Sequence, residues 1–246
     1  MTEGTVQQDW NDHSHWWVRE FTDGVDPEYE EQIIPLVVAR LGGAGRVLDL
    51  GTGEGQLARA LGNAGAEVVG LDPFPGQIEV AVERGGGAAY GVGSADAIPM
   101  ASGSVDAVVA CLVFEHIDEV DDAIAEVARV LRPGGRFLFL LNHPLLQTPN
   151  SGWIDDQILD PPEQYWRLGE YLNEAVTTEE VGKDIFVKFI HRPLSRYLNT
   201  LIGAGLTLRR IDEPAPPPGF LDLSPKYEAA ASIPRLLVLD LTKTAQ

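Results

Sequence analysis

The chain has 246 residues, 44% of them hydrophobic, which suits one α/β domain with a sizeable core. Its formal charge of -19, from 37 acidic and 18 basic residues, would repel a phosphate backbone and argues against nucleic-acid partners. A single cysteine, Cys111, excludes an internal disulfide and a multi-cysteine zinc site. Because the chain also lacks a long apolar run and a basic-then-apolar N-terminus, we expect a cytoplasmic protein without a membrane partner.

The first 30 residues form an aromatic N-terminal segment. Trp10, Trp16 and Trp17 lie within seventeen residues of the start, together with His13 and His15. An acidic helix is expected to begin just after them, near residues 26–27. The aromatic side chains either fix loops onto the core or help to enclose a small, partly apolar ligand.

Residues 46–55 are the most informative about function. A short apolar strand runs through Asp49 into a turn with glycines at positions 51, 53 and 55. Glycine tolerates positive φ and has no Cβ, so such a turn between strand and helix can hold a nucleotide-like molecule against the backbone. The turn differs from the dinucleotide fingerprint G-x-G-x-x-G, because Gln56 stands at its last position.

A second apolar strand, expected at residues 67–72 after a helix from about 54 to 63, ends in Asp72. At the carboxyl end of a parallel strand a carboxylate faces the ligand crevice, where it can accept hydrogen bonds from two vicinal ribose hydroxyls. We therefore interpret Asp72 as a ribose ligand. The alternative is a solvated aspartate at the end of a strand.

The next elements alternate in the same manner. A short polar segment at 93–99 precedes an apolar strand at 105–111, and a helix is expected from about 118 to 131. A helix stop and glycine turn at 131–136 then leads into a strand at 137–141. Strands that alternate with amphipathic helices predict a parallel sheet covered on both faces.

Residues 144–184 interrupt this alternation and are rich in aromatic side chains among polar and proline residues. An insertion of this kind lies over the carboxyl ends of the strands, where it can close on a bound ligand. Beyond it we expect a helix that opens near residues 193–195 and strands at 206–211 and 236–241. The aromatic residues of the insertion are Trp153, Tyr165, Trp166 and Tyr171.

Five of these elements, in order over residues 46–142, resemble the motifs of the class I S-adenosylmethionine (SAM)-dependent methyltransferases. The resemblance implies an α/β, Rossmann-like fold over roughly residues 30–245, with helices on both faces of a seven-stranded, mostly parallel sheet. It implies the strand order 3-2-1-4-5-7-6, with the last two strands antiparallel. Residues 1–246 would then form a single domain, in which the insertion 144–184 serves as a lid over the substrate.

The same resemblance implies that SAM is the cofactor. The residue after Asp72 would lie against adenine, the side chain of Asp96 and the backbone N–H of Ala97 would reach the adenine edge, and Cys111 with Leu112 would pass under the methionine part. The implied cofactor-binding residues are Asp49, Gly51, Thr52, Gly53, Gly55, Asp72, Pro73, Asp96, Ala97, Cys111 and Leu112.

Methyl transfer is an in-line displacement, so the main task is to hold the nucleophile about 3 Å from the methyl carbon. A hydroxyl acceptor can lose its proton to a histidine. His143, directly after the fifth strand, is the first candidate for this catalytic base and His191 is the second. Each has the alternative role of anchoring a loop.

The segment around His116 resembles part of a Glu-x-x-Glu-His pattern of ubiquinone-type O-methyltransferases, in which two carboxylates and a histidine can hold a divalent ion. Leu112 stands at the first carboxylate position, so the ligand set is incomplete. We expect no metal, and a structural role for His116 at the start of a helix.

We conclude from the sequence that the chain resembles the ubiquinone and menaquinone biosynthesis methyltransferases. The reaction expected is methyl transfer from SAM to a small-molecule acceptor through an oxygen nucleophile, by a monomer or homodimer. Two alternatives remain open: a non-catalytic SAM-binding sensor or scaffold, and an NAD-dependent oxidoreductase. The acceptor itself is not identified by the sequence.

Overall fold

The computed structural model describes residues 25–182, 185–223 and 229–244. The tryptophans and histidines of the N-terminal aromatic segment lie outside the described residues. Any contribution of that segment to a ligand site therefore stays a prediction, as does the assignment of residues 1–246 to a single domain.

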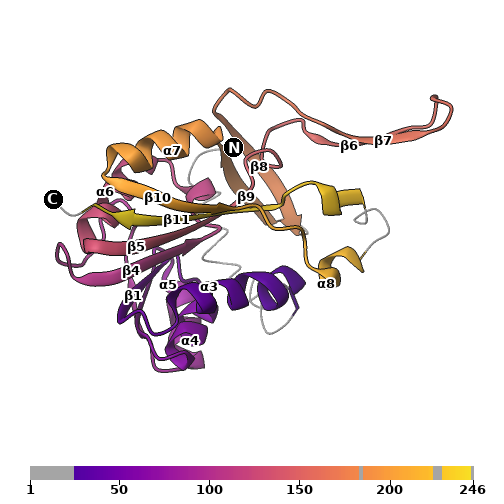
Figure 1. The fold of residues 1–246 in the computed structure, drawn as a ribbon. Coiled ribbons are helices and arrows are strands. Elements are labelled where there is room, and N and C mark those ends of the chain that lie inside the picture. The colour runs from indigo at the N-terminus through magenta and orange to yellow at the C-terminus, as the bar shows by residue number, and fades with distance from the viewer. Residues whose placement is uncertain (1–24, 183–184, 224–228, 245–246) are drawn as a thin grey trace.

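A seven-stranded sheet forms the centre of the molecule, in the order β10-β11-β5-β4-β1-β2-β3 (Figure 1). Neighbouring strands are parallel except at β11, which pairs antiparallel with both β5 and β10. The predicted order 3-2-1-4-5-7-6 is therefore confirmed, with β10 and β11 as the sixth and seventh strands. The seven strands are β1 (Arg46–Leu50), β2 (Glu67–Asp72), β3 (Ala89–Val92), β4 (Val105–Cys111), β5 (Leu131–Asn142), β10 (Leu206–Asp212) and β11 (Leu236–Lys243).

Helices cover both faces of this sheet, as the alternating pattern predicted (Figure 1). On one face α6 and α7 bury their apolar side chains against the sheet, and on the other η1, α3 and α4 do so. The helices are η1 (Tyr29–Ile33), α3 (Ile34–Leu41), α4 (Gln56–Asn63), α5 (Pro75–Arg84), η2 (Phe114–His116), α6 (Val120–Val130), α7 (Leu194–Gly203), α8 (Pro218–Leu221) and η4 (Ala229–Ser232). Among the described residues, no helix is long and apolar enough to cross a membrane.

The expected turn at residues 131–136 is part of a strand. β5 begins at Leu131, directly after α6, and its register against β4 shifts between Val105 and Ala107. Gly134 has φ of 75°, and a Cβ on Gly135 would lie 3.0 Å from the carbonyl oxygen of Asp106. The glycines therefore form an irregularity inside β5.

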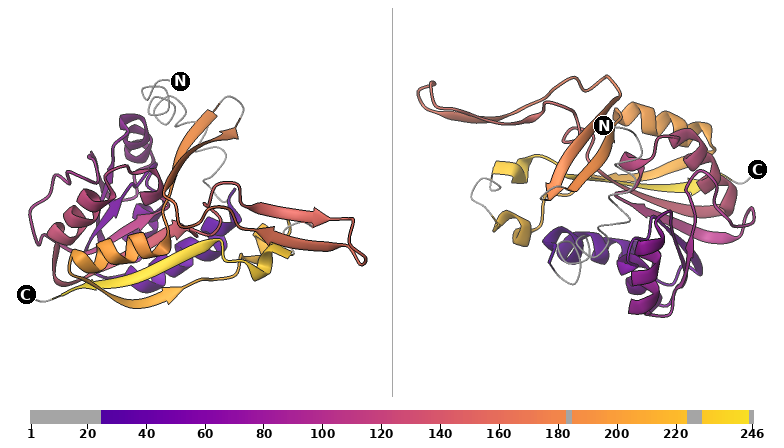
Figure 2. Two further views of the ribbon diagram at one scale, coloured as in Figure 1. Left: turned by 90° about the horizontal axis from the view of Figure 1, so that it is seen from above. Right: turned by 180° about the vertical axis from the view of Figure 1, so that it is seen from behind.

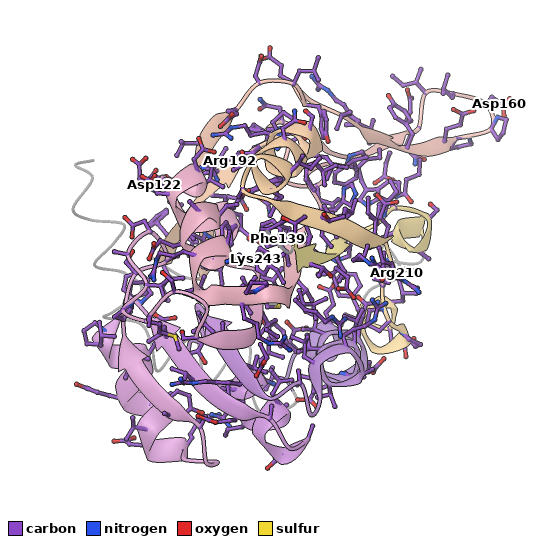
Figure 3. The ribbon with its side chains drawn as sticks, turned by 60° about the vertical axis from the view of Figure 1, so that its left-hand side comes forward. Asp122, Phe139, Asp160, Arg192, Arg210 and Lys243 are labelled. Carbon is purple, nitrogen blue, oxygen red and sulfur yellow. The ribbon has the colours of Figure 1, made fainter. Side chains whose placement is uncertain are left out.

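The insertion between β5 and α7 folds into two separate hairpins. One consists of β6 (Gly152–Asp156) and β7 (Glu163–Arg167), and it projects away from the body of the molecule in both views of Figure 2. Figure 3 places Asp160 at the far end of this arm, whereas Phe139 lies within the body. The other hairpin, β8 (Ala175–Gly182) with β9 (Ile185–His191), remains close to the sheet (Figure 1).

Arg192 attaches the end of β9 to the carboxyl edge of the sheet. Its side chain is 3% exposed, and its guanidinium donates to the carbonyl oxygens of Phe114, Ile117 and Asp118 at 2.7 to 3.1 Å. These carbonyls belong to η2 and the residues after it, which follow β4. The hairpin β8–β9 is thus held beside the ends of the parallel strands, where a ligand of this fold binds.

Candidate functional site

The three glycines of the turn after β1 have different structural roles. All have positive φ: 74° at Gly51, 54° at Gly53 and 86° at Gly55. A Cβ on Gly51 would lie 2.3 Å from a methyl group of Val113, and one on Gly55 would lie 2.5 Å from the hydroxyl of Tyr90. A Cβ on Gly53 would meet nothing closer than 3.9 Å. Gly51 and Gly55 therefore allow close packing, while Gly53 leaves open backbone for a ligand.

This difference predicts unequal effects of two alanine substitutions. Gly55→Ala is expected to lower the free energy of unfolding by about 2 to 4 kcal/mol, because a strained positive φ adds to a clash with Tyr90. Gly53→Ala carries only the backbone strain, about 1 to 2 kcal/mol. Urea unfolding of the two variants beside the parent protein measures the difference. Equal losses of stability in the two variants would contradict the different roles given to Gly53 and Gly55.

Two buried carboxylates hold the glycine turn. Asp49 accepts a hydrogen bond from the hydroxyl of Thr52 at 2.7 Å. Asp72, 6% exposed, accepts from the backbone N–H of Gly53 at 2.9 Å and from that of Phe74 at 3.0 Å. Burial raises the pKa of each carboxyl from 3.8 to about 6. The structure thus places the expected ribose ligand directly against the open glycine.

The adenine-side residues are less enclosed among the described residues. Pro73 is exposed after β2, and Asp96 is exposed on the loop after β3. The carboxylate of Asp96 accepts from the hydroxyl of Ser94, and the N–H of Ala97 donates to the carbonyl of Ser94 at 3.3 Å. Their contacts with adenine stay predictions.

The end of β4 brings together residues that are distant in the sequence. The thiol of Cys111 lies 3.9 Å from the hydroxyl of Tyr29 on η1, and burial raises the pKa of that thiol. Leu112 follows with φ of 56°, a left-handed conformation that is uncommon for a residue other than glycine and that concentrates at functional sites. Sequence analysis named Cys111 and Leu112 but missed Tyr29, which no local motif marks.

Two further polar residues at the site were not predicted as ligands. Gln77 of α5 is 2% exposed, and its Oε1 is the atom closest to the open side of Gly53. Neither this oxygen nor Oε2 of the buried Glu115 has a hydrogen-bond partner within the described part of the chain. Orphaned buried oxygens of this kind are rare in folded proteins and fit a site that receives donors from a ligand. The sequence showed Glu115 only as part of an incomplete metal pattern.

The two candidate catalytic histidines differ in their free lone pairs. His143 donates from Nε2 to the carboxylate of Glu213 at 2.8 Å, and its Nδ1 accepts from the N–H of Leu145 at 3.1 Å. His191 donates from Nε2 to the carbonyl of Tyr171 at 2.8 Å, which leaves its buried Nδ1 as an acceptor without a described partner. A general base needs an unoccupied lone pair, and among the ring nitrogens of these two histidines only Nδ1 of His191 has no described partner.

His116 is engaged with β9. Its Nδ1 donates to the carbonyl of Lys188 at 2.7 Å, and its ring packs on Phe189 with centroids 4.7 Å apart. Within residues 25–182, 185–223 and 229–244, no three His, Cys, Asp or Glu side chains are grouped as metal ligands would be.

The aromatic residues of the insertion lie in the β6–β7 hairpin and in the turn that precedes β8. Trp153 and Trp166 face each other across β6 and β7, with ring centroids 5.6 Å apart, in the arm that projects outward. The hydroxyl of Tyr171 accepts from the N–H of Leu194 at the start of α7, so it anchors a helix. If the insertion acts as a lid, this role falls to β8–β9 beside η2.

Residues 48–139 match a family model described as a methyltransferase domain. An uncharacterized methyltransferase of Mycobacterium tuberculosis is 37% identical over 154 residues, which are 63% of this chain and 59% of that protein. The chain thus spans less than two thirds of the length of that relative. A ubiquinone/menaquinone biosynthesis C-methyltransferase of Desulfotalea psychrophila is 38% identical over 115 residues, 44% of this chain and 47% of that protein.

Among solved structures, a SAM-dependent methyltransferase from Mesorhizobium loti superimposes with a TM-score of 0.73. It is 26% identical in sequence, and the match covers 85% of this chain and 96% of that one. The structural match therefore covers much more of the chain than residues 48–139, which match the family model.

Proposed function

We propose that this chain, which carries a class I SAM-dependent methyltransferase domain, transfers the methyl group of SAM to a small-molecule acceptor through an oxygen nucleophile. The observation that carries the proposal is the contact between Asp72 and the glycine turn. The carboxylate accepts from the N–H of Gly53, beside the one glycine of the turn whose missing side chain leaves space.

The residues present fit SAM. Asp72 would hold the ribose, and Oε1 of Gln77 offers a further acceptor beside Gly53. Cys111, Leu112 and Tyr29 surround the end of β4, on the path expected for the methionine part. When bound, SAM supplies an electrophilic methyl group on a sulfonium, and the chain has to hold the nucleophile in line with it.

His191 would take the proton of the acceptor hydroxyl. Its hydrogen bond to the carbonyl of Tyr171 places the proton of the neutral ring on Nε2 and the lone pair on Nδ1. The residue stands at the end of β9, which Arg192 attaches to η2 at the carboxyl edge. His143, the first candidate from the sequence, is better suited to fixing the loop after β5 to Glu213.

The direct test measures release of S-adenosylhomocysteine (SAH) by the purified protein against a panel of phenols, carboxylic acids and amines. A product methylated on the oxygen of a phenol or a carboxylic acid supports the proposal, whereas release only with amines, or a product methylated on a ring carbon of the phenol, overturns the oxygen nucleophile. SAM binding without SAH release from any acceptor would favour a non-catalytic SAM-binding protein. Tighter binding of NAD than of SAM would overturn the cofactor.

A further inference from the structure

Glu115 carries a carboxylate oxygen for which the described fold provides no donor. The side chain is 2% exposed. Its Oε1 accepts two hydrogen bonds from Asn142 at the end of β5, from the backbone N–H at 3.2 Å and from the side-chain amide at 2.9 Å. Its Oε2 accepts none among the described residues. A buried carboxylate is costly unless it is fully paired, so the second oxygen requires a partner.

Burial raises the pKa of the Glu115 carboxyl, because an unpaired charge is costly there, and the neighbouring His116 lowers it. Other acidic groups lie near the same end of β4. Burial raises the pKa of the Cys111 thiol, and the negative charges of Glu115, Asp49 and Asp26 raise it further, so these carboxylates all act on the end of β4. Asp49 lies at the end of β1, and Asp26 lies before η1. Acidic groups from three parts of the chain thus act on the thiol at the end of β4.

The cations near Glu115 are already engaged. Three nitrogen–oxygen contacts hold the guanidinium of Arg192 to backbone carbonyls, and its Nε lies 3.6 Å from Glu174. The Nδ1 atom of His116 faces the carbonyl of Lys188. Tyr197, whose pKa is raised by burial and then by the charge of Glu115, contributes no positive charge. A cationic ligand beside Oε2 would therefore favour the ionised form of Glu115.

We propose that Glu115 is a specificity-determining residue that makes the site favour SAM, a sulfonium cation, over SAH, a neutral thioether. This inference rests on the proposed function, because it assumes that the methionine part of the cofactor lies at the end of β4. A carboxylate in a water-excluded site attracts a cation far more strongly than one in water, and discrimination is a difference between two affinities. Once the methyl group has left, the sulfur is uncharged and the attraction ends, which assists release of the product.

The test compares Glu115→Gln with the parent protein by calorimetric titration with SAM and with SAH. Glutamine keeps an oxygen acceptor for Asn142 and removes only the charge. We expect the ratio of the SAH to the SAM dissociation constant to fall at least fivefold, because SAM binding weakens while SAH binding changes less than twofold. Glu119→Gln, an exposed neighbour with the same change of charge, is the matched control and should leave the ratio unchanged.

An equal loss for both ligands, or no loss, would overturn the role of Glu115 while leaving the proposed function intact. Failure of the parent protein to bind either ligand would instead overturn the proposed function. If Glu115→Gln does not fold, a second measurement on the parent protein tests the same proposal. Sinefungin carries an amine in place of the methylsulfonium, so it is also a cation. Both sinefungin and SAM should bind the parent protein more tightly than SAH does. Tighter binding of SAH than of both cations would contradict the proposal.

Discussion

Replacing His191 by glutamine is expected to lower kcat by about 10²-fold or more, within the usual contribution of a general base. The amide of glutamine can still donate to the carbonyl of Tyr171, as Nε2 of the histidine does, but it offers no base in place of Nδ1. SAM affinity should stay within about twofold of the parent value, because the substitution leaves the glycine turn and Asp72 unchanged. Initial rates with the hydroxyl acceptor found in the SAH-release screen provide the measurement.

His143→Gln is the matched comparison. Its amide can preserve the donor to Glu213, so the loop after β5 should keep its position. We expect its kcat to remain within about fivefold of the parent value, because both ring nitrogens of His143 already have partners in the chain. A large loss in this variant with a fully active His191→Gln would reverse the two roles. Full activity of both variants would mean that positioning alone suffices.

Asp72→Ala is expected to weaken SAM binding by about 1.5 to 3 kcal/mol, the range for hydrogen bonds to a charged partner. Two ribose hydroxyls would lose their acceptor, and the N–H of Gly53 would lose the carboxylate that holds the turn. Calorimetric titration measures the affinity, and thermal unfolding checks that the variant is folded. Glu67→Ala, at the exposed opposite end of the same strand, should bind SAM as the parent does. Unchanged affinity in folded Asp72→Ala would refute the assignment.

The pH dependence of SAM binding tests the same carboxylate without mutation. Burial raises the pKa of Asp72 to about 6, so the carboxyl is ionised above this pH and protonated below it. Since the ionised form is the stronger acceptor for the ribose hydroxyls, affinity should be constant above about pH 7 and fall by up to about tenfold per unit below pH 6. A constant affinity between pH 5 and 8 would contradict this expectation.

The elevated pKa also affects the stability of the protein without ligand. A carboxyl whose pKa is higher in the folded chain holds its proton more tightly there than in the unfolded chain. Stability should therefore decrease as pH rises from 3.8 to about 6 through the contribution of Asp72, and Asp49 acts in the same direction. In the proposed complex, the ribose hydroxyls of SAM would donate to the ionised Asp72 and offset this loss.

The sequence by itself predicted the fold class, which the structure confirms, and marked the glycine turn and Asp72 as the candidate cofactor site. The strands that became β2 and β4 were predicted with their observed bounds, because apolar runs and their flanking turns are local patterns. The glycine turn and Asp72 were also recognisable, since both come at the carboxyl ends of strands whose parallel pairing brings them together.

Only the tertiary structure showed which side chains gather at the end of β4 and which contacts the two histidines make. Tyr29 meets Cys111 across 82 positions of the chain, and the Oε1 atom of Glu115 is held by Asn142 from the next strand. The proposal of His191 over His143 as the base rests on which ring nitrogens have partners in the fold, and no sequence pattern encodes those contacts. The direction of the β6–β7 arm was likewise unpredictable from its aromatic content. These features arise from contacts between distant segments, whereas periodicity and turn chemistry report only the local conformation of the chain.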